Sequence, residues 1–171
     1  RSHRVVDCEN CILQPPIFAD IVKIFRKFII KNGITVYDSE KHTGLLRHIY
    51  LRLAEATGEV MVCAVINGED LPHKNELIEK LTEIPSVKSI VLNINRDRTN
   101  VILGKECVTV WGNDCIYDVL CGVKVRLSPL SFYQVNHDMA QQLYEKAAEY
   151  ACLSGKETVL DMYCGTGTIG L

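Results

Sequence analysis

The sequence predicts an α+β domain with helices on one face of a mostly antiparallel sheet, followed by the first elements of a second, α/β unit. The first part of this prediction rests on the order of elements in residues 1–126, which is a helix, two strands, a helix and further strands. The second part rests on a short apolar strand at residues 158–160 that runs into a glycine-rich turn. With 47% hydrophobic and 23% charged residues in 171, the chain is able to bury a globular core.

Residues 1–126 contain two amphipathic helical segments between β-rich stretches. Apolar residues from Ile17 to Phe28 recur at helical spacing after Pro15 and Pro16, which predicts a helix over residues 17–30. A second helix is expected over residues 72–83, ended by Pro85. Strands are expected at residues 46–53, 59–66, 87–94, 100–103, 108–111 and 123–127. The first helix carries several lysines and arginines, and residues 41–52 carry three more basic residues and no acid; each patch alone is typical of a solvated face.

A boundary is expected near residues 127–136, which divides the chain into a central domain, 1–126, and a second domain that begins at 127 and runs to 171. Residues 137–153 have Ala140, Leu143 and Ala147 on one helical face, and Ser154–Gly155 is a helix-stop signal. The apolar strand then leads into Asp161. This part of the chain therefore predicts a helix, a strand and a glycine turn in that order.

The glycine turn has the spacing Gly-x-Gly-x-x-Gly, with Gly165, Gly167 and Gly170. Glycines let a backbone approach a ligand closely, and a following helix N-terminus offers N–H donors. Dinucleotide-binding folds share this spacing, but their ribose-binding acid, about 20 residues further on, would fall beyond Leu171. A helix-capping aspartate in a structural loop is the alternative for Asp161.

Asp161 precedes Gly165 by four residues, and Asp-x-x-x-Gly-x-Gly after an apolar strand resembles motif I of class I, Rossmann-like, S-adenosylmethionine-dependent methyltransferases. Together, SFYQVN (131–136) and LDMYCGTGTIGL (160–171) are similar to the RNA uracil-5-methyltransferase family, which makes 5-methyluridine in transfer and ribosomal RNA. The similarity continues through LRHIYLR (46–52), TGEVMV (57–62) and VLNINRDRTNVILG (91–104), so it covers most of the chain.

The resemblance implies a cofactor, S-adenosyl-L-methionine, and half of its site. Gln134, Tyr163 and Thr168 match positions that contact the cofactor in the family. Asp161, Gly165 and Gly167 match positions that shape the loop around it. The structural alternatives are a Gln134 satisfied within the core and a packed Tyr163.

The chemistry that the resemblance implies needs residues beyond this chain. A cysteine thiolate adds to C6 of uracil, C5 then takes the methyl group, and a base removes the C5 proton. In the family this cysteine and base lie downstream of motif I, so we expect the chain to be an inactive fragment of a methyltransferase. Cys164, inside the glycine turn, is expected to fit the loop and not to act as the nucleophile.

Cys8 and Cys11 form a Cys-x-x-Cys pair, which by itself is a weak metal signal. Some family members hold a 4Fe-4S cluster, and Cys11 matches their fourth ligand, while the other three would precede Arg1. Whether Cys11 is such a lone ligand stays open. Cys63, Cys107, Cys121 and Cys152 stand singly in apolar surroundings, which favours reduced, buried thiols and a cytoplasmic protein.

The expected partner is RNA, either transfer or ribosomal, which the sequence does not distinguish. The net charge of −2 gives no overall basic signature, so only the family resemblance favours RNA contacts for the basic patches. A non-catalytic RNA-binding or scaffold module is the alternative, and a dehydrogenase fragment ranks third. We expect no membrane association, because no apolar run is long enough. The apolar segment 155–171 is expected either to form a dimer or to be poorly ordered.

Overall fold

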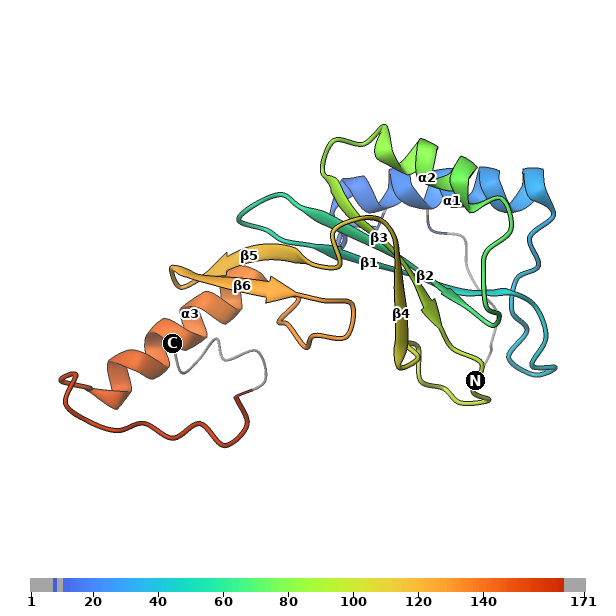
Figure 1. Cartoon of the computed structure of the whole chain (residues 1–171). Coiled ribbons are helices and arrows are strands. Elements are labelled where there is room, and N and C mark those ends of the chain that lie inside the picture. Colours follow the sequence, from blue (N-terminus) through green and yellow to red (C-terminus); the bar gives the residue numbers. More distant parts are fainter. Residues whose placement is uncertain (1–7, 9–10, 165–171) are drawn as a thin grey trace.

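A computed structural model describes Cys8 and residues 11–164 of the chain (Figure 1). Its elements, in order, are α1 (Pro16–Asn32), β1 (Leu46–Leu53), β2 (Val60–Ile66), α2 (Lys74–Thr82), β3 (Val87–Ile94), β4 (Glu106–Gly112), β5 (Ile116–Leu120), β6 (Val123–Leu127) and α3 (His137–Ala151). Two layers are visible in Figure 1: α1 and α2 cover one face of a sheet made by β1 to β4, while β5, β6 and α3 extend to one side. Among the described residues, no helix is both long and apolar enough to cross a membrane.

The four-stranded sheet is mixed, with the order β1-β2-β3-β4. β1 pairs with β2 and β3 pairs with β4 in antiparallel register, whereas β2 and β3 are parallel. A parallel pair needs a crossover connection, and α2 supplies it. The predicted α+β class therefore agrees with the structure, and the mostly antiparallel sheet has one parallel pairing at its centre.

The largest apolar core lies between this sheet and its two helices. α1 begins with Pro16, whose missing N–H costs nothing in the first turn, and it ends at Gly33, which has a left-handed φ of 61°. Ile21 and Phe25 of α1 are completely buried, and Leu81 of α2 joins them. The helical periodicity of the sequence thus predicted which face of α1 is buried.

The strand predicted at residues 100–103 is wrong, because this stretch is a loop that side chains hold. Asn95 donates its side-chain amide to the carbonyls of Val101 (2.8 Å) and Ile102 (3.0 Å). The guanidinium of Arg47 donates to the carbonyls of Asn95, Asp97 and Thr99 at 2.8, 2.8 and 3.1 Å. These carbonyls bond to side chains, and no neighbouring strand pairs with the loop.

The sequence missed β5, which pairs with β6 in an antiparallel hairpin. β5 alternates buried and half-buried residues as a strand should, but Asp118 stands in one of its buried positions. The hairpin shares a second apolar cluster with α3 and with the main sheet; it contains Ala54, Met61, Ile116, Leu120, Val125, Leu127 and Ala140. This cluster joins residues from both sides of the boundary predicted at 126/127, which stays a prediction.

The described part of the C-terminal segment forms no strand. α3 ends at Ala151, earlier than predicted, and Cys152 closes it with a left-handed φ of 49°. Residues 158–160, predicted as the strand before motif I, are not in a sheet, since no described strand pairs with them. Val159 and Leu160 are exposed instead, in agreement with the expectation that this segment is not a covered strand of its own chain.

Candidate cofactor-binding loop

The loop from 128 to 136 joins β6 to α3 and carries Gln134, the first predicted cofactor contact. At its start the Ser128 backbone N–H donates to the hydroxyl of Ser131 (3.0 Å), and Arg52 of β1 donates to the Ser131 carbonyl (2.7 Å). At its end Asn136 caps α3 by accepting the N–H of Met139 (3.1 Å). Local hydrogen bonds at both ends, together with Arg52 from β1, therefore fix the ends of the loop.

The loop on either side of Gln134 is fixed by Tyr133 and by His137, the first residue of α3. The Tyr133 hydroxyl donates to the carboxylate of Asp118 at 3.0 Å. Burial, and then the negative charge of Asp118, raise the pKa of Tyr133 well above its ordinary value, so this hydroxyl keeps its proton. The ring of His137 lies 2.9 Å from the Val119 carbonyl, which can only accept, so Nε2 carries a proton.

Gln134 itself is exposed, in contrast to the alternative that its side chain is satisfied within the core. Together with Val135 and His137 it lines a cavity of about 190 Å³, whose other walls come from α1, the segment before it, and β1. Tyr50 and Arg52 of β1 face the same cavity. The loop thus presents an amide, which both donates and accepts hydrogen bonds, beside a small partly apolar cavity.

Asp161 and Tyr163 are the other predicted site residues that the structure describes. The carboxylate of Asp161 accepts the backbone N–H of Tyr163 at 3.0 Å, which is a local turn. Tyr163 is 95% exposed and is not packed, contrary to the structural alternative for it. Within the described part of the chain, no hydrogen bond joins this turn to Gln134. Gly165, Gly167 and Thr168 lie outside the described residues.

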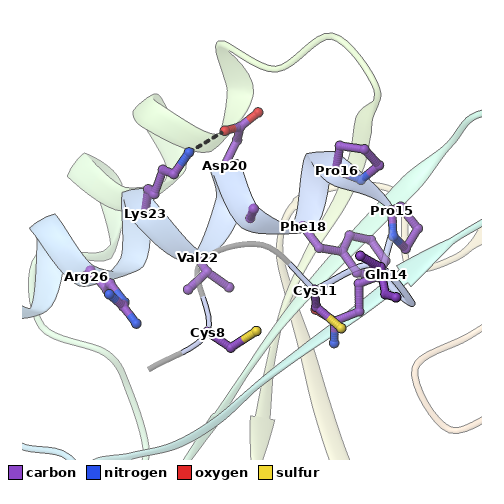
Figure 2. A pocket seen from close by; sticks show the side chains of 12 residues that line it. Cys8, Cys11, Gln14, Pro15, Pro16, Phe18, Asp20, Val22, Lys23 and Arg26 are labelled. Carbon is purple, nitrogen blue, oxygen red and sulfur yellow. Dashed lines mark hydrogen bonds and ion pairs between the residues drawn. The ribbon is translucent and has the colours of Figure 1, made fainter. Parts of the chain in front are cut away.

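Cys8 and Cys11 both line a cavity of about 350 Å³ beside the first turns of α1, as Figure 2 shows. Cys11 is half-buried and Cys8 is exposed. The cavity wall also includes Lys23, which pairs with Asp20 at 3.3 Å. No group of three or more His, Cys, Asp or Glu side chains able to hold a metal ion occurs in residues 8 and 11–164. The described residues alone therefore do not fit a 4Fe-4S cluster, which needs four ligands.

The other cysteines differ in their surroundings. Cys63 is buried in the sheet, and burial raises the pKa of its thiol to about 12, so it is unreactive at neutral pH. Cys107 and Cys121 are half-buried. Cys152 is exposed, which corrects the expectation that it is buried; it follows the last turn of α3 and faces away from the core.

The basic patches are largely committed to contacts within the protein. Besides its three carbonyl contacts, Arg47 lies over the ring of Tyr37, with 4.3 Å from its guanidinium carbon to the ring centre. Lys31 pairs with Glu76 of α2 at 2.7 Å. Arg47 and Arg52, both in the basic patch of residues 41–52, hold the 95–103 loop and the 128–136 loop in place.

Sequence reasoning missed Asp118, Tyr133 and His137 as residues that hold the candidate site. A signal for Asp118 exists: it is an acid inside the otherwise apolar run CIYDVL (115–120), and buried acids are rare unless they are paired. Its partners were not predictable, since they come from the turn after β1 and from the loop before α3.

Comparison with known proteins places the chain among RNA methyltransferases. It is 47% identical over 172 aligned residues to an RNA methyltransferase of Clostridium tetani, with 100% of this chain and 37% of that protein covered. It is 46% identical to an RNA methyltransferase of Halalkalibacterium halodurans, with 100% of this chain and 38% of the relative covered. No protein-family model matches the chain.

A similar solved structure is the tRNA (uracil-54, C5)-methyltransferase of Pyrococcus abyssi in complex with S-adenosyl-L-homocysteine. It is 30% identical, with a TM-score of 0.78, and the match covers 98% of this chain and 39% of that one. The chain is thus similar to RNA methyltransferases over its length, and the resemblance to RNA uracil-5-methyltransferases is confirmed. It spans less than two-fifths of the length of these relatives.

Proposed function

We propose that the protein containing this chain transfers the methyl group of S-adenosyl-L-methionine to C5 of a uracil in transfer or ribosomal RNA, in the cytoplasm. The observation that carries the proposal is the similarity, over 98% of the chain, to a tRNA uracil-54 C5-methyltransferase whose structure contains S-adenosyl-L-homocysteine. Uracil C5 is a weak nucleophile. A cysteine thiolate that adds to C6 makes C5 nucleophilic enough to attack the methyl group, and a base then removes the C5 proton.

Gln134 is the described residue that best fits a cofactor contact in this proposal. It is exposed on a loop fixed on both sides, and it lies at a cavity. Asp161 and Tyr163 would contribute from the turn that leads to Gly165, Gly167 and Thr168. The cofactor supplies an electrophilic methyl group when bound, and these residues bind and orient it. Cys11 remains a candidate ligand for a 4Fe-4S cluster in the complete protein, and no step of the reaction is assigned to such a cluster.

The test uses the complete protein that contains this chain, with S-adenosyl-L-methionine and in vitro transcripts of transfer and ribosomal RNA. The expected product is 5-methyluridine in one of the two, detected by mass spectrometry of the digested RNA. Gln134→Ala should raise the KM for the cofactor about two- to tenfold, since loss of a neutral hydrogen bond costs about 0.5–1.5 kcal/mol. Gln142→Ala, an exposed glutamine on α3, is the matched control and should behave as the wild type.

Two outcomes would contradict the proposal. RNA that is bound but never methylated would favour the non-catalytic RNA-binding module. Methylation at a position other than C5 of uracil would place the protein in another class of RNA methyltransferase. Residues 1–171 alone are expected to transfer no methyl group, because the nucleophilic cysteine and the base of the family would not be among them.

A further inference from the structure

Asp118 is a completely buried carboxylate in the middle of β5, and each of its oxygens accepts two hydrogen bonds. One oxygen accepts the N–H groups of Ala56 (2.8 Å) and Val119 (2.9 Å). The other accepts the N–H of Glu55 (3.1 Å) and the hydroxyl of Tyr133 (3.0 Å). A buried charge is stable only when its hydrogen-bonding capacity is filled, and here it is filled by four donors.

These four donors come from separate parts of the chain. Glu55 and Ala56 form the turn after β1, Val119 belongs to β5, and Tyr133 belongs to the loop before α3. Two further contacts join the same turn region to β5, since Thr57 donates to the Tyr117 carbonyl and Glu59 accepts the Tyr117 N–H. The carboxylate is therefore the common point at which the main sheet, the hairpin and the loop meet.

The position of Tyr133 in the loop gives this arrangement a consequence for Gln134. The Tyr133 hydroxyl bonds to the buried Asp118, whereas the next residue, Gln134, is exposed, and both residues line the same cavity. Gln134 follows Tyr133 directly in the chain, so a fixed Tyr133 side chain restricts the backbone that carries the Gln134 amide. Without the Tyr133 contact, the bonds of Ser131 and His137 would remain, but each of these residues is three positions from Gln134 in the chain, whereas Tyr133 is its direct neighbour.

We infer that Asp118 and Tyr133 are positioning residues for cofactor binding, which act by holding Gln134 in its binding orientation. This inference rests on the proposed function. A ligand that binds only the held form of the loop has an apparent Kd equal to its intrinsic Kd divided by the fraction of loops in the held form. Loss of the Tyr133 hydroxyl lowers that fraction. It does not alter the groups that react, so it should act on cofactor affinity and not on the rate at saturation.

The experiment compares Tyr133→Phe with wild type in the complete protein. We expect the KM for S-adenosyl-L-methionine and the Kd for S-adenosyl-L-homocysteine to rise about three- to tenfold. The kcat at saturating cofactor and the KM for RNA should stay within about twofold. Amide hydrogen exchange of residues 129–136 should become faster, with the exchange of α1 unchanged. The matched control is Tyr150→Phe, which removes a hydroxyl from an exposed tyrosine on α3 and should leave all of these values unchanged.

An unchanged cofactor KM in Tyr133→Phe would overturn the inference, as would a fall in kcat alone. A Tyr133→Phe protein that does not fold would overturn it too, because the hydroxyl would then be a requirement of the fold. If the wild type binds S-adenosyl-L-homocysteine but methylates no uracil, the proposed function fails. The positioning inference is then still tested by the Kd for S-adenosyl-L-homocysteine and by hydrogen exchange. If wild type methylates uracil and Tyr133→Phe matches it in every value, only the positioning inference fails.

Discussion

The sheet with α1 and α2 is stabilised by a large apolar core, whereas the hairpin and α3 share a smaller apolar cluster and a buried carboxylate. In the first region Ile21, Phe25 and Leu81 are completely buried among the strands. In the second, α3 contributes one buried residue, Ala140, and most of the helix is exposed. The specific contacts of the second region are the hydrogen bonds to Asp118 and the His137 contact with the Val119 carbonyl.

The difference concerns precision of placement as much as stability. Apolar contacts depend mainly on the area removed from water and have little directionality, so they stabilise a core without fixing each atom. Hydrogen bonds to a buried carboxylate depend on distance and angle. The region that carries Gln134 is thus held by the more directional kind of contact, which suits a loop that must present one side chain to a ligand.

The largest effect is expected from Phe25→Ala, which removes a completely buried ring from the first region. We expect the free energy of unfolding to fall by about 3–5 kcal/mol, through lost burial and the cavity left behind. Urea denaturation of residues 1–171 measures it. Ile30→Ala on the same helix, at an 81% exposed position, should change the free energy by less than about 0.5 kcal/mol. Equal effects for the two variants would contradict the described face of α1.

Asp118→Asn tests the polar contact of the second region. An asparagine has one accepting oxygen and one NH₂ group, so in either orientation a donor would face the donors that now bond to Asp118. The expected loss is about 2–3 kcal/mol in the free energy of unfolding. Asp114→Asn, at an exposed position before the same hairpin, is the control. A loss below about 0.5 kcal/mol would mean that the second region does not depend on the carboxylate.

A smaller effect on the first region is expected when the chain is ended at Arg126, the predicted domain boundary. This removes Leu127 and Ala140 from the second cluster, but nothing from the core under α1 and α2. We expect residues 1–126 to unfold cooperatively, followed by circular dichroism during urea denaturation. Unfolding without a cooperative transition would place the boundary elsewhere and make the two regions one folding unit.

Deletion of residues 155–171 should leave the unfolding of both regions unchanged, because its described part packs on neither core. Val159 and Leu160 are exposed, and exposed apolar segments favour association with another chain. We therefore expect residues 1–171 to form dimers and residues 1–154 to be monomeric, as measured by light scattering after size-exclusion chromatography. Monomers in both cases would rule out association through this segment.

The sequence determined most of the first region, because its signals are local. Helical spacing placed α1, and short segments rich in apolar residues placed β1 to β3 within about one residue. The family resemblance also came from contiguous motifs, SFYQVN and LDMYCGTGTIGL. Predictions failed where a segment depends on side-chain partners, as in the 100–103 stretch, whose Val101 and Ile102 carbonyls accept from Asn95, while Arg47 of β1 donates to the preceding Thr99 carbonyl.

Tertiary structure alone decided which polar residues hold the candidate site. The sequence around Arg52 and around Asp118 does not indicate that either residue contacts the 128–136 loop. Arg52 is 79 residues from Ser131, and Asp118 is 15 residues from Tyr133. The same holds for the parallel pairing of β2 and β3 and for the exposure of Gln134. Local periodicity reports which side of an element is buried, but a hydrogen bond between distant segments exists only once the fold has brought donor and acceptor within reach.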